Sequence, residues 1–161
     1  MCSTPTVEAV YAGIVAVLGT LLGSSATYVF QRRVAERGEH FSRTERVRQD
    51  RLSAYSTFAE AVTEYRGSQY KRWSCEQVDP ASAESSAAEA ESHRLRGVTR
   101  QIRWRMQLLT EDQELIRLAD EAVICAKNVR EAADLAERQR KHDAAGEAIE
   151  RFVLHAASHV R

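Results

Sequence analysis

One uncharged segment near the N-terminus constrains this chain more than any other feature. The run Ala9–Gln31 contains no charged side chain and is flanked by Glu8 and Arg32. As a helix it would span roughly 33 Å, enough to cross a bilayer hydrocarbon core of about 30 Å. Tyr11 and Tyr28 lie near its two ends, where aromatic rings favour the headgroup level. The run therefore predicts a transmembrane helix.

Two other interpretations of this segment fit its flanking residues less well. A cleaved signal peptide would explain the small residues Ser24–Ala26, but residues 1–8 contain none of the basic charge that such signals begin with. A buried helix of a soluble protein would usually have a charge along one edge. The arginines that follow, from Arg32 to Arg51, predict that the segment stays in the membrane with the N-terminus outside and the C-terminus in the cytoplasm.

Small residues within this segment have a spacing that suits helix pairing. Gly19 and Gly23 form a G-x-x-x-G pair, and Thr27 extends the same face by one turn. Such a face lets two membrane helices approach closely, since lipid itself provides no hydrophobic drive for pairing. A homodimer through these residues is one interpretation; the simpler one is that the glycines have no partner, as is common in membrane helices.

The composition of the whole chain favours helices and a balanced surface. Its 161 residues include 23 basic and 23 acidic side chains, only two prolines and seven glycines. The neutral balance argues against a dedicated nucleic-acid-binding protein. Cys75 and Cys125 have no C-x-x-C partner, and in the cytoplasm both are expected to be free thiols.

After the membrane segment, apolar residues recur at helical steps of three and four, with no strand-like alternation. We expect an all-α fold, in which a transmembrane helix precedes an antiparallel bundle of three to four helices. The expected parts are an extracytoplasmic tail at 1–8, a transmembrane helix at 9–31, a basic juxtamembrane stalk at 32–46 and a cytoplasmic helical bundle at 47–161.

Helix boundaries are predicted from capping residues. Ser42–Glu45 fits a capping box that would start a helix after a break at Gly38, although one unbroken helix to about Cys75 is equally compatible. Asp79 is expected to cap the next helix, with Pro80 at its first position. The expected cap of the third helix is Thr110, with Gln113 completing a box, and the last turn is placed at 138–146.

A basic stretch, "HRLRGVTRQIRWR", is the first candidate site. It contains one tryptophan, no acidic residue and the arginines Arg94, Arg96, Arg100, Arg103 and Arg105. A basic amphipathic helix of this kind can contact anionic lipid or phosphate. The simpler interpretation is a solvated face that acidic residues of the next helix, from Glu111 to Glu121, balance across an antiparallel hairpin.

The second candidate site is a pair of histidines one helical turn apart. His155 and His159 have the spacing with which a helix binds a metal ion. The sequence around them lacks the glutamate of zinc peptidases, and it points to no third ligand. We therefore predict no metal and no cofactor, and we interpret both side chains as exposed histidines of the C-terminal turn.

In two stretches, "RLSAYSTFAEAVTEYR" and "RLRGVTRQIRWR…LIRLADEA", the chain resembles small single-pass membrane proteins of actinobacteria, streptomycetes in particular. The resemblance covers most of the length and implies a host, but it implies no activity.

Three functions are compatible with these observations. The favoured one is a non-enzymatic scaffold, sensor or regulatory module that is tethered to the bilayer and contacts an unidentified cytoplasmic protein. A second is an accessory membrane protein of a mobile element or a defence system. A third is an enzyme with a polar or metal site inside the bundle, which would need several histidines or carboxylates directed into the core.

Overall fold

A computed structural model describes residues 5–160, with side chains from Ser42 to Val160. Its helices are α1 (Pro5–Val78), α2 (Ala83–Gln107), α3 (Gln113–Asn128) and α4 (Leu135–Ser158), and a short 3₁₀ helix, η1 (Val129–Glu131), lies between the last two. The described residues contain no strand. The chain divides into two compact units, Met1–Arg46 and Val47–Arg161.

No helix that is long and apolar enough to span a membrane occurs among the residues with described side chains. The predicted tail at 1–8 and the predicted transmembrane helix at 9–31 lie outside those residues. The same holds for Gly19, Gly23 and Thr27, and for most of the predicted stalk.

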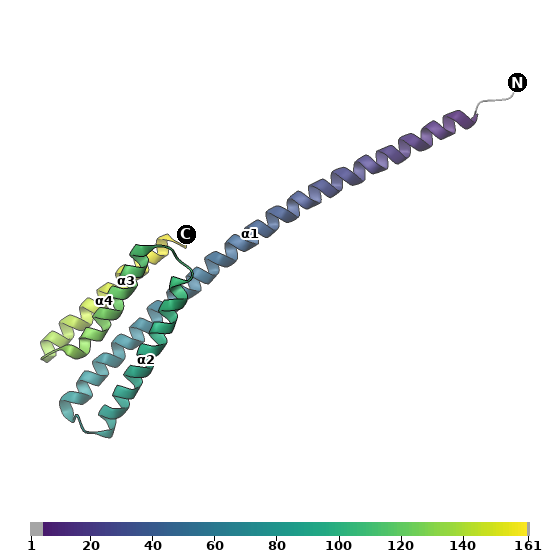
Figure 1. Cartoon of the computed structure of the whole chain (residues 1–161). Helices are drawn as coiled ribbons and strands as arrows, with labels where there is room; N and C mark the ends of the chain where they lie inside the picture. The colour runs from purple at the N-terminus through teal and green to yellow at the C-terminus, as the bar shows by residue number, and fades with distance from the viewer. Residues whose placement is uncertain (1–4, 161) are drawn as a thin grey trace. The chain divides into compact units, whose positions relative to one another are not determined.

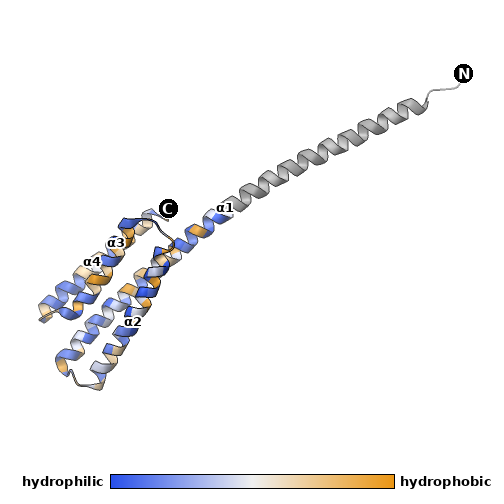
Figure 2. Cartoon of the chain, viewed as in Figure 1, coloured by the Kyte–Doolittle hydropathy of each residue, from blue (hydrophilic) through white to orange (hydrophobic). Residues whose placement is uncertain are grey.

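The second unit is a bundle of four helices in which consecutive helices run in opposite directions (Figure 1). The C-terminal part of α1 pairs with α2 in one hairpin, and α3 pairs with α4 in another (Figure 1). This arrangement confirms the predicted all-helical bundle. Both apolar and hydrophilic residues occur along α2, α3, α4 and the coloured part of α1 (Figure 2). Helices of this kind pack their apolar face inward.

Aromatic side chains from two distant parts of the sequence form the centre of the core. The ring of Phe152 lies 4.8 Å from that of Phe58 and 6.5 Å from that of Tyr55, both in edge-to-face arrangements. Phe58 and Phe152 are fully buried. Burying a phenylalanine contributes about 1.5–3 kcal/mol, so these contacts between α1 and α4 are a main source of stability.

Small side chains fill the core where the last two helices meet. The fully or almost fully buried alanines of α3 and α4 are Ala119, Ala122, Ala126, Ala145, Ala148 and Ala156. Small residues let helix axes approach closely, which compensates in packing density for the smaller apolar area of each residue.

Polar side chains join α1 to α2 inside the bundle. Gln69 donates from Nε2 to the Ser92 hydroxyl at 3.0 Å, and both side chains are buried. The buried Thr99 hydroxyl lies 2.9 Å from the Leu95 carbonyl of its own helix and 3.2 Å from the Ala61 carbonyl of α1. Such bonds satisfy groups that would otherwise be costly to bury.

No helix starts at Ser42–Glu45, because α1 runs through these residues without interruption. Of the two alternatives left open by the sequence, the structure has the unbroken helix at this point. It ends at Val78, close to the predicted Cys75.

The cap of α2 lies three residues beyond the predicted Asp79. Ser82 is the N-cap, and its hydroxyl accepts a hydrogen bond from the Ser85 amide at 3.1 Å. Asp79 instead accepts one from the Ala81 amide at 2.9 Å, which closes a turn around Pro80. The Asp79 side chain thus stabilises the loop, since it accepts a hydrogen bond from the amide two residues ahead, as in an Asx turn.

The cap of α3 is Asp112 rather than the predicted Thr110. Its Oδ1 accepts hydrogen bonds from the amides of Glu114 at 2.8 Å and Leu115 at 3.2 Å. The Thr110 hydroxyl accepts one from the Asp112 amide at 3.2 Å, so it supports the turn before the helix. Both residue types cap helices well, and here the carboxylate has the capping position.

The turn predicted at 138–146 is also wrong, because these residues lie within α4. The chain turns earlier, at η1, and α4 starts after the N-cap Asp134. Asp134 accepts a hydrogen bond from the Glu137 amide at 2.7 Å, while the Glu137 carboxylate accepts one from the Ala133 amide at 2.7 Å. The two bonds resemble a capping box, except that Glu137 bonds the residue before the N-cap, and they stabilise the break between α3 and α4.

Candidate functional site

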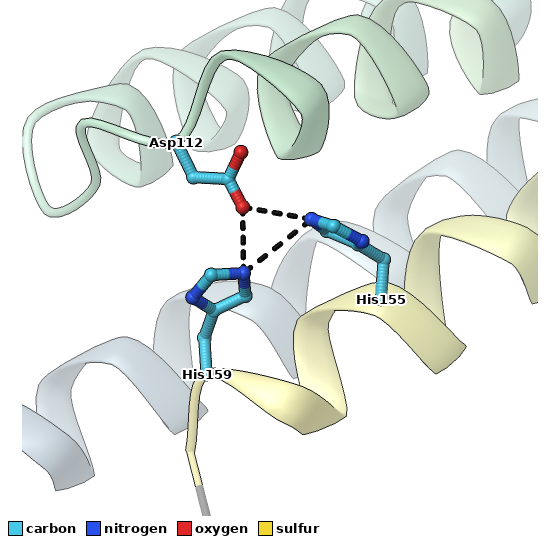
Figure 3. A group of neighbouring side chains, drawn as sticks. All are labelled: Asp112, His155 and His159. Atoms are coloured by element: carbon cyan, nitrogen blue, oxygen red, sulfur yellow. Dashed lines mark hydrogen bonds and ion pairs between the residues drawn. The ribbon is translucent and has the colours of Figure 1, made fainter.

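Three side chains capable of binding a metal ion meet at one end of the bundle. Asp112 caps the start of α3, and His155 and His159 lie at the C-terminal end of α4, where His159 is the C-cap. Figure 3 shows the carboxylate and the two imidazoles directed toward one another from these two helices. The antiparallel packing of α3 on α4 brings this start and this end together.

The three groups meet through single atoms. Oδ2 of Asp112 lies 2.7 Å from Nε2 of His155 and 2.6 Å from Nε2 of His159. The two Nε2 atoms are 3.4 Å apart (Figure 3). These distances describe a closed triangle of one oxygen and two nitrogens.

The two carboxylate oxygens of Asp112 have different partners. Oδ1 caps α3, and Oδ2 faces the histidines. The hydrogen bond with His155 is the main reason that the pKa of Asp112 lies below its ordinary value, and the capping bonds from Leu115 and Glu114 lower it further. Asp112 is therefore a carboxylate near neutral pH.

The triangle lies at the surface and is partly shielded from water. The exposed fractions of the side chains are 19% for Asp112, 32% for His155 and 36% for His159. The triangle therefore lies at the surface of the bundle and not in its core.

The structure also identifies a third possible ligand beside the histidine pair. The interpretation of the sequence found no third ligand, and Asp112 is 43 residues before His155. The segment "LLTEDQEL" shows that a helix starts here, but it does not show that Asp112, and not the predicted Thr110, caps α3 beside the end of α4.

An apolar groove runs between α1 and α4 near the same end of the bundle. Its volume is about 290 Å³, and its lining residues are Leu52, Tyr55, Ser56, Ala59, Phe152, Val153, Ala156, Ala157 and Val160. Leu52 and Val153 are about half exposed there. The backbone carbonyl of Val160 accepts a hydrogen bond from Nε of Arg48 at 2.7 Å, which fixes the end of the chain to α1.

The five arginines of the basic stretch lie on α2 and have different surroundings. Arg103 pairs with Asp120 of α3 at 2.5 Å, so one of the expected bridges across the hairpin is present. Arg94 pairs with Glu91 of its own helix at 2.7 Å, and the guanidinium of Arg100 lies 5.4 Å from the centre of the Trp104 ring.

Arg96 and Arg105 are exposed. Two of the other acidic residues expected to balance the basic stretch have partners outside it: Glu114 pairs with Arg117, and Glu121 pairs with Arg117 and Arg151. Contact between this face and an anionic surface stays a prediction.

The fold and its surface thus define a class: a small antiparallel four-helix bundle with an apolar groove and a polar triangle at one end. A comparison with protein families gives this class a name, since residues 52–160 match the family described as KilB plasmid transfer protein. The match covers more than half of the chain, which therefore belongs to this family. No curated protein and no solved structure matches the chain.

Proposed function

We propose that this protein is an accessory component of plasmid transfer that acts as a non-enzymatic helical module tethered to the membrane. The observation that carries the proposal is the family match, which starts within α1 and ends beyond α4. The unit shared with the family is therefore the helical bundle, so we assign the role in transfer to the bundle and the role of tether to the segment before it.

A non-enzymatic role agrees with how the buried polar residues are used. Gln69 bonds to Ser92, and Arg72 pairs with Glu76 and Glu89. The Gln69–Ser92 and Arg72–Glu89 pairs join α1 to α2, and the Arg72–Glu76 pair lies within α1. Gln69, Arg72 and Ser92 also line a polar cavity of about 90 Å³. Pairs that join helices in this way support a structural scaffold, whose activity depends on the partners that it holds in place.

Transfer from a donor strain tests this proposal. Removing the gene from a transmissible plasmid should lower the transfer frequency, and supplying the chain in the same donor should restore it. Phe58→Asp places a charge in the core and should fail to restore transfer, whereas the exposed Glu60→Gln should succeed. Unchanged transfer without the gene would refute the role, provided that the copy number of the plasmid is also unchanged.

The tether and its orientation are tested by thiol labelling. If residues 9–31 cross the membrane with the N-terminus outside, a membrane-impermeant reagent should modify Cys2 in cells whose outer layers are opened. Cys75, a partly buried free thiol, should react only after the membrane is permeabilised. Labelling of Cys75 before permeabilisation, with Cys2 unreactive, would contradict the orientation.

Dimerisation through the membrane segment is the third part of the proposal. If Gly19 and Gly23 form a close contact, Gly23→Ile should weaken self-association by about 1 kcal/mol, and Leu22→Ile should not. Crosslinking in membranes is the measurement. Association of Gly23→Ile equal to that of the wild-type chain would show that the glycines are not at an interface, and the protein would then be a monomer unless its cytoplasmic helices pair.

A further inference from the structure

The triangle of Asp112, His155 and His159 has the donor set of a transition-metal site. Imidazole nitrogens and a carboxylate oxygen are the ligands of zinc sites with three protein donors, in which water takes the remaining position. The three donor atoms lie within 4.8 Å of one another. The site differs from a cluster of surface carboxylates, because two of its three donors are histidines from one helix.

The spacing of the two nitrogens suits a single ion. With bonds of 2.0–2.1 Å, two ligands of a tetrahedral ion are about 3.3 Å apart. The Nε2 atoms of His155 and His159 are 3.4 Å apart, which is that separation. Oδ2 of Asp112 lies closer to each nitrogen, at 2.7 and 2.6 Å, as expected for hydrogen bonds in the metal-free state.

Only a small movement of the carboxylate separates the hydrogen-bonded triangle from a coordinated one. Opening each oxygen–nitrogen edge to the tetrahedral value requires about 0.6 Å, which rotation of an aspartate side chain can supply. The rings would then present unprotonated Nε2 atoms, with their hydrogens on Nδ1. Binding therefore replaces the bridging protons by the ion.

The backbone on both sides holds the donors in place. Capping bonds from the amides of Glu114 and Leu115 fix Oδ1 of Asp112, so that Oδ2 has one preferred direction. The histidines lie at the C-terminal end of α4, where the helix dipole favours a positive charge. Arg48 holds this end of the chain by bonding the Val160 carbonyl.

We propose that Asp112 Oδ2, His155 Nε2 and His159 Nε2 bind one divalent transition-metal ion of the zinc type, with solvent completing the coordination. The ion joins the start of α3 to the end of α4, in place of two hydrogen bonds. It stabilises this end of the bundle next to the apolar groove, and it leaves an open coordination position toward solvent.

Metal titration of the full-length chain tests the proposal. The chain is purified without a histidine tag, stripped with a chelator and titrated with Zn²⁺ near pH 7.5 by calorimetry. We expect one Zn²⁺ per chain and a melting temperature that rises by roughly 5 °C at ten times the dissociation constant. Co²⁺ in place of Zn²⁺ should produce the visible absorption of a four- or five-coordinate ion.

Three substitutions separate this site from adventitious binding. Asp112→Asn keeps the cap, because an asparagine oxygen can still accept the bonds from Glu114 and Leu115, but it removes the charged ligand. It should weaken Zn²⁺ binding at least tenfold, as should His159→Gln at an exposed position. His93→Ala removes an exposed histidine of α2 and should leave binding unchanged.

Circular dichroism in the presence of chelator checks that each variant is folded, and Asp112→Asn is the decisive one because its cap is retained. The proposal is overturned if the wild-type chain binds no Zn²⁺ at submillimolar concentration. It is equally overturned if Asp112→Asn binds Zn²⁺ as tightly as the wild-type chain, since the bound ion would then lie elsewhere.

Discussion

The guanidinium of Arg138 in α4 lies 3.9 Å from the centre of the Tyr70 ring in α1, and its Nη2 donates to the Tyr70 hydroxyl at 2.7 Å. The same guanidinium lies 4.5 Å from the centre of the Trp73 ring, and its Nη1 donates to the Ser74 hydroxyl at 2.8 Å. Arg138 is almost completely buried. Its hydrogen-bond partners among the described residues are thus neutral hydroxyls, and aromatic faces stabilise its charge.

Removing this guanidinium should therefore be costly. Desolvated cation–π contacts and hydrogen bonds from a charged donor each contribute about 2 kcal/mol, so Arg138→Ala should lower the free energy of unfolding by about 3 kcal/mol. Arg140→Ala, at an exposed position of the same helix, should change it by less than about 0.5 kcal/mol. Urea unfolding measures both. Similar values for the two variants would show that the aromatic cage contributes little.

The N-cap of α4 gives a second prediction. Asp134→Ala should lower the free energy of unfolding by about 1 kcal/mol, because the Glu137 amide loses its acceptor. Asp134→Asn retains an acceptor oxygen and should cost much less. A cost that is the same for both substitutions would indicate that charge, and not the hydrogen bond, is what matters at this position.

The bundle itself follows from the sequence because its apolar residues repeat at helical steps, and Phe58, Leu115 and Phe152 are buried as that pattern predicts. The turn between α3 and α4 was misplaced because "REAADLAERQRK" has no glycine or proline and consists largely of helix-forming residues. A tertiary contact helps to fix the position of this turn. Nε1 of Trp73 donates to the Ala132 carbonyl at 2.8 Å, and Ala132 lies in the non-helical segment between η1 and α4. A single sequence does not show such a contact.

Glycines inside helices give a third prediction. Gly97 has no atom near the position of an added Cβ, so Gly97→Ala should stabilise the bundle by up to about 1 kcal/mol through helix propensity alone. At Gly146 an added Cβ would lie 2.5 Å from Nη1 of Arg66, so Gly146→Ala should gain less, because this side chain must move.

Combining Gly146→Ala with Arg66→Ala distinguishes the two contributions. If Arg66 is what limits the gain, Gly146→Ala should be more favourable in the Arg66→Ala background than in the wild type, by an amount that a double-mutant cycle measures. Additive effects would mean that the guanidinium moves away at no cost.

His142 makes stability depend on pH. Burial, and next the charge of Arg66, hold the pKa of His142 below its ordinary value of 6.5, while Asp143 opposes this and Arg138 adds to it. The unfolded chain therefore takes up a proton first as the pH falls, and the free energy of unfolding should decrease below pH 6.5. His142→Gln removes this contribution, so its unfolding free energy should fall less steeply over that interval. Parallel pH curves for the two proteins would exclude His142 as the cause.

The candidate site was only half visible in the sequence. His155 and His159 are four residues apart, and helix geometry alone places such residues on the same face. Asp112 depends on two facts that no local pattern contains, namely which residue caps α3 and which helix end lies beside that cap. Both are consequences of antiparallel packing, so the third donor becomes visible only in the folded bundle.

The central claim is that a tethered bundle acts in plasmid transfer, and complementation with altered N-termini tests it most directly. A donor that lacks the gene receives the full chain, a chain that starts at Ser42, or that shortened chain fused to an unrelated single-pass anchor with the same orientation. All three should accumulate equally, which immunoblotting checks. We predict that the full chain and the anchored fusion restore the transfer frequency and that the untethered chain does not. Full restoration by the chain starting at Ser42 would contradict the account.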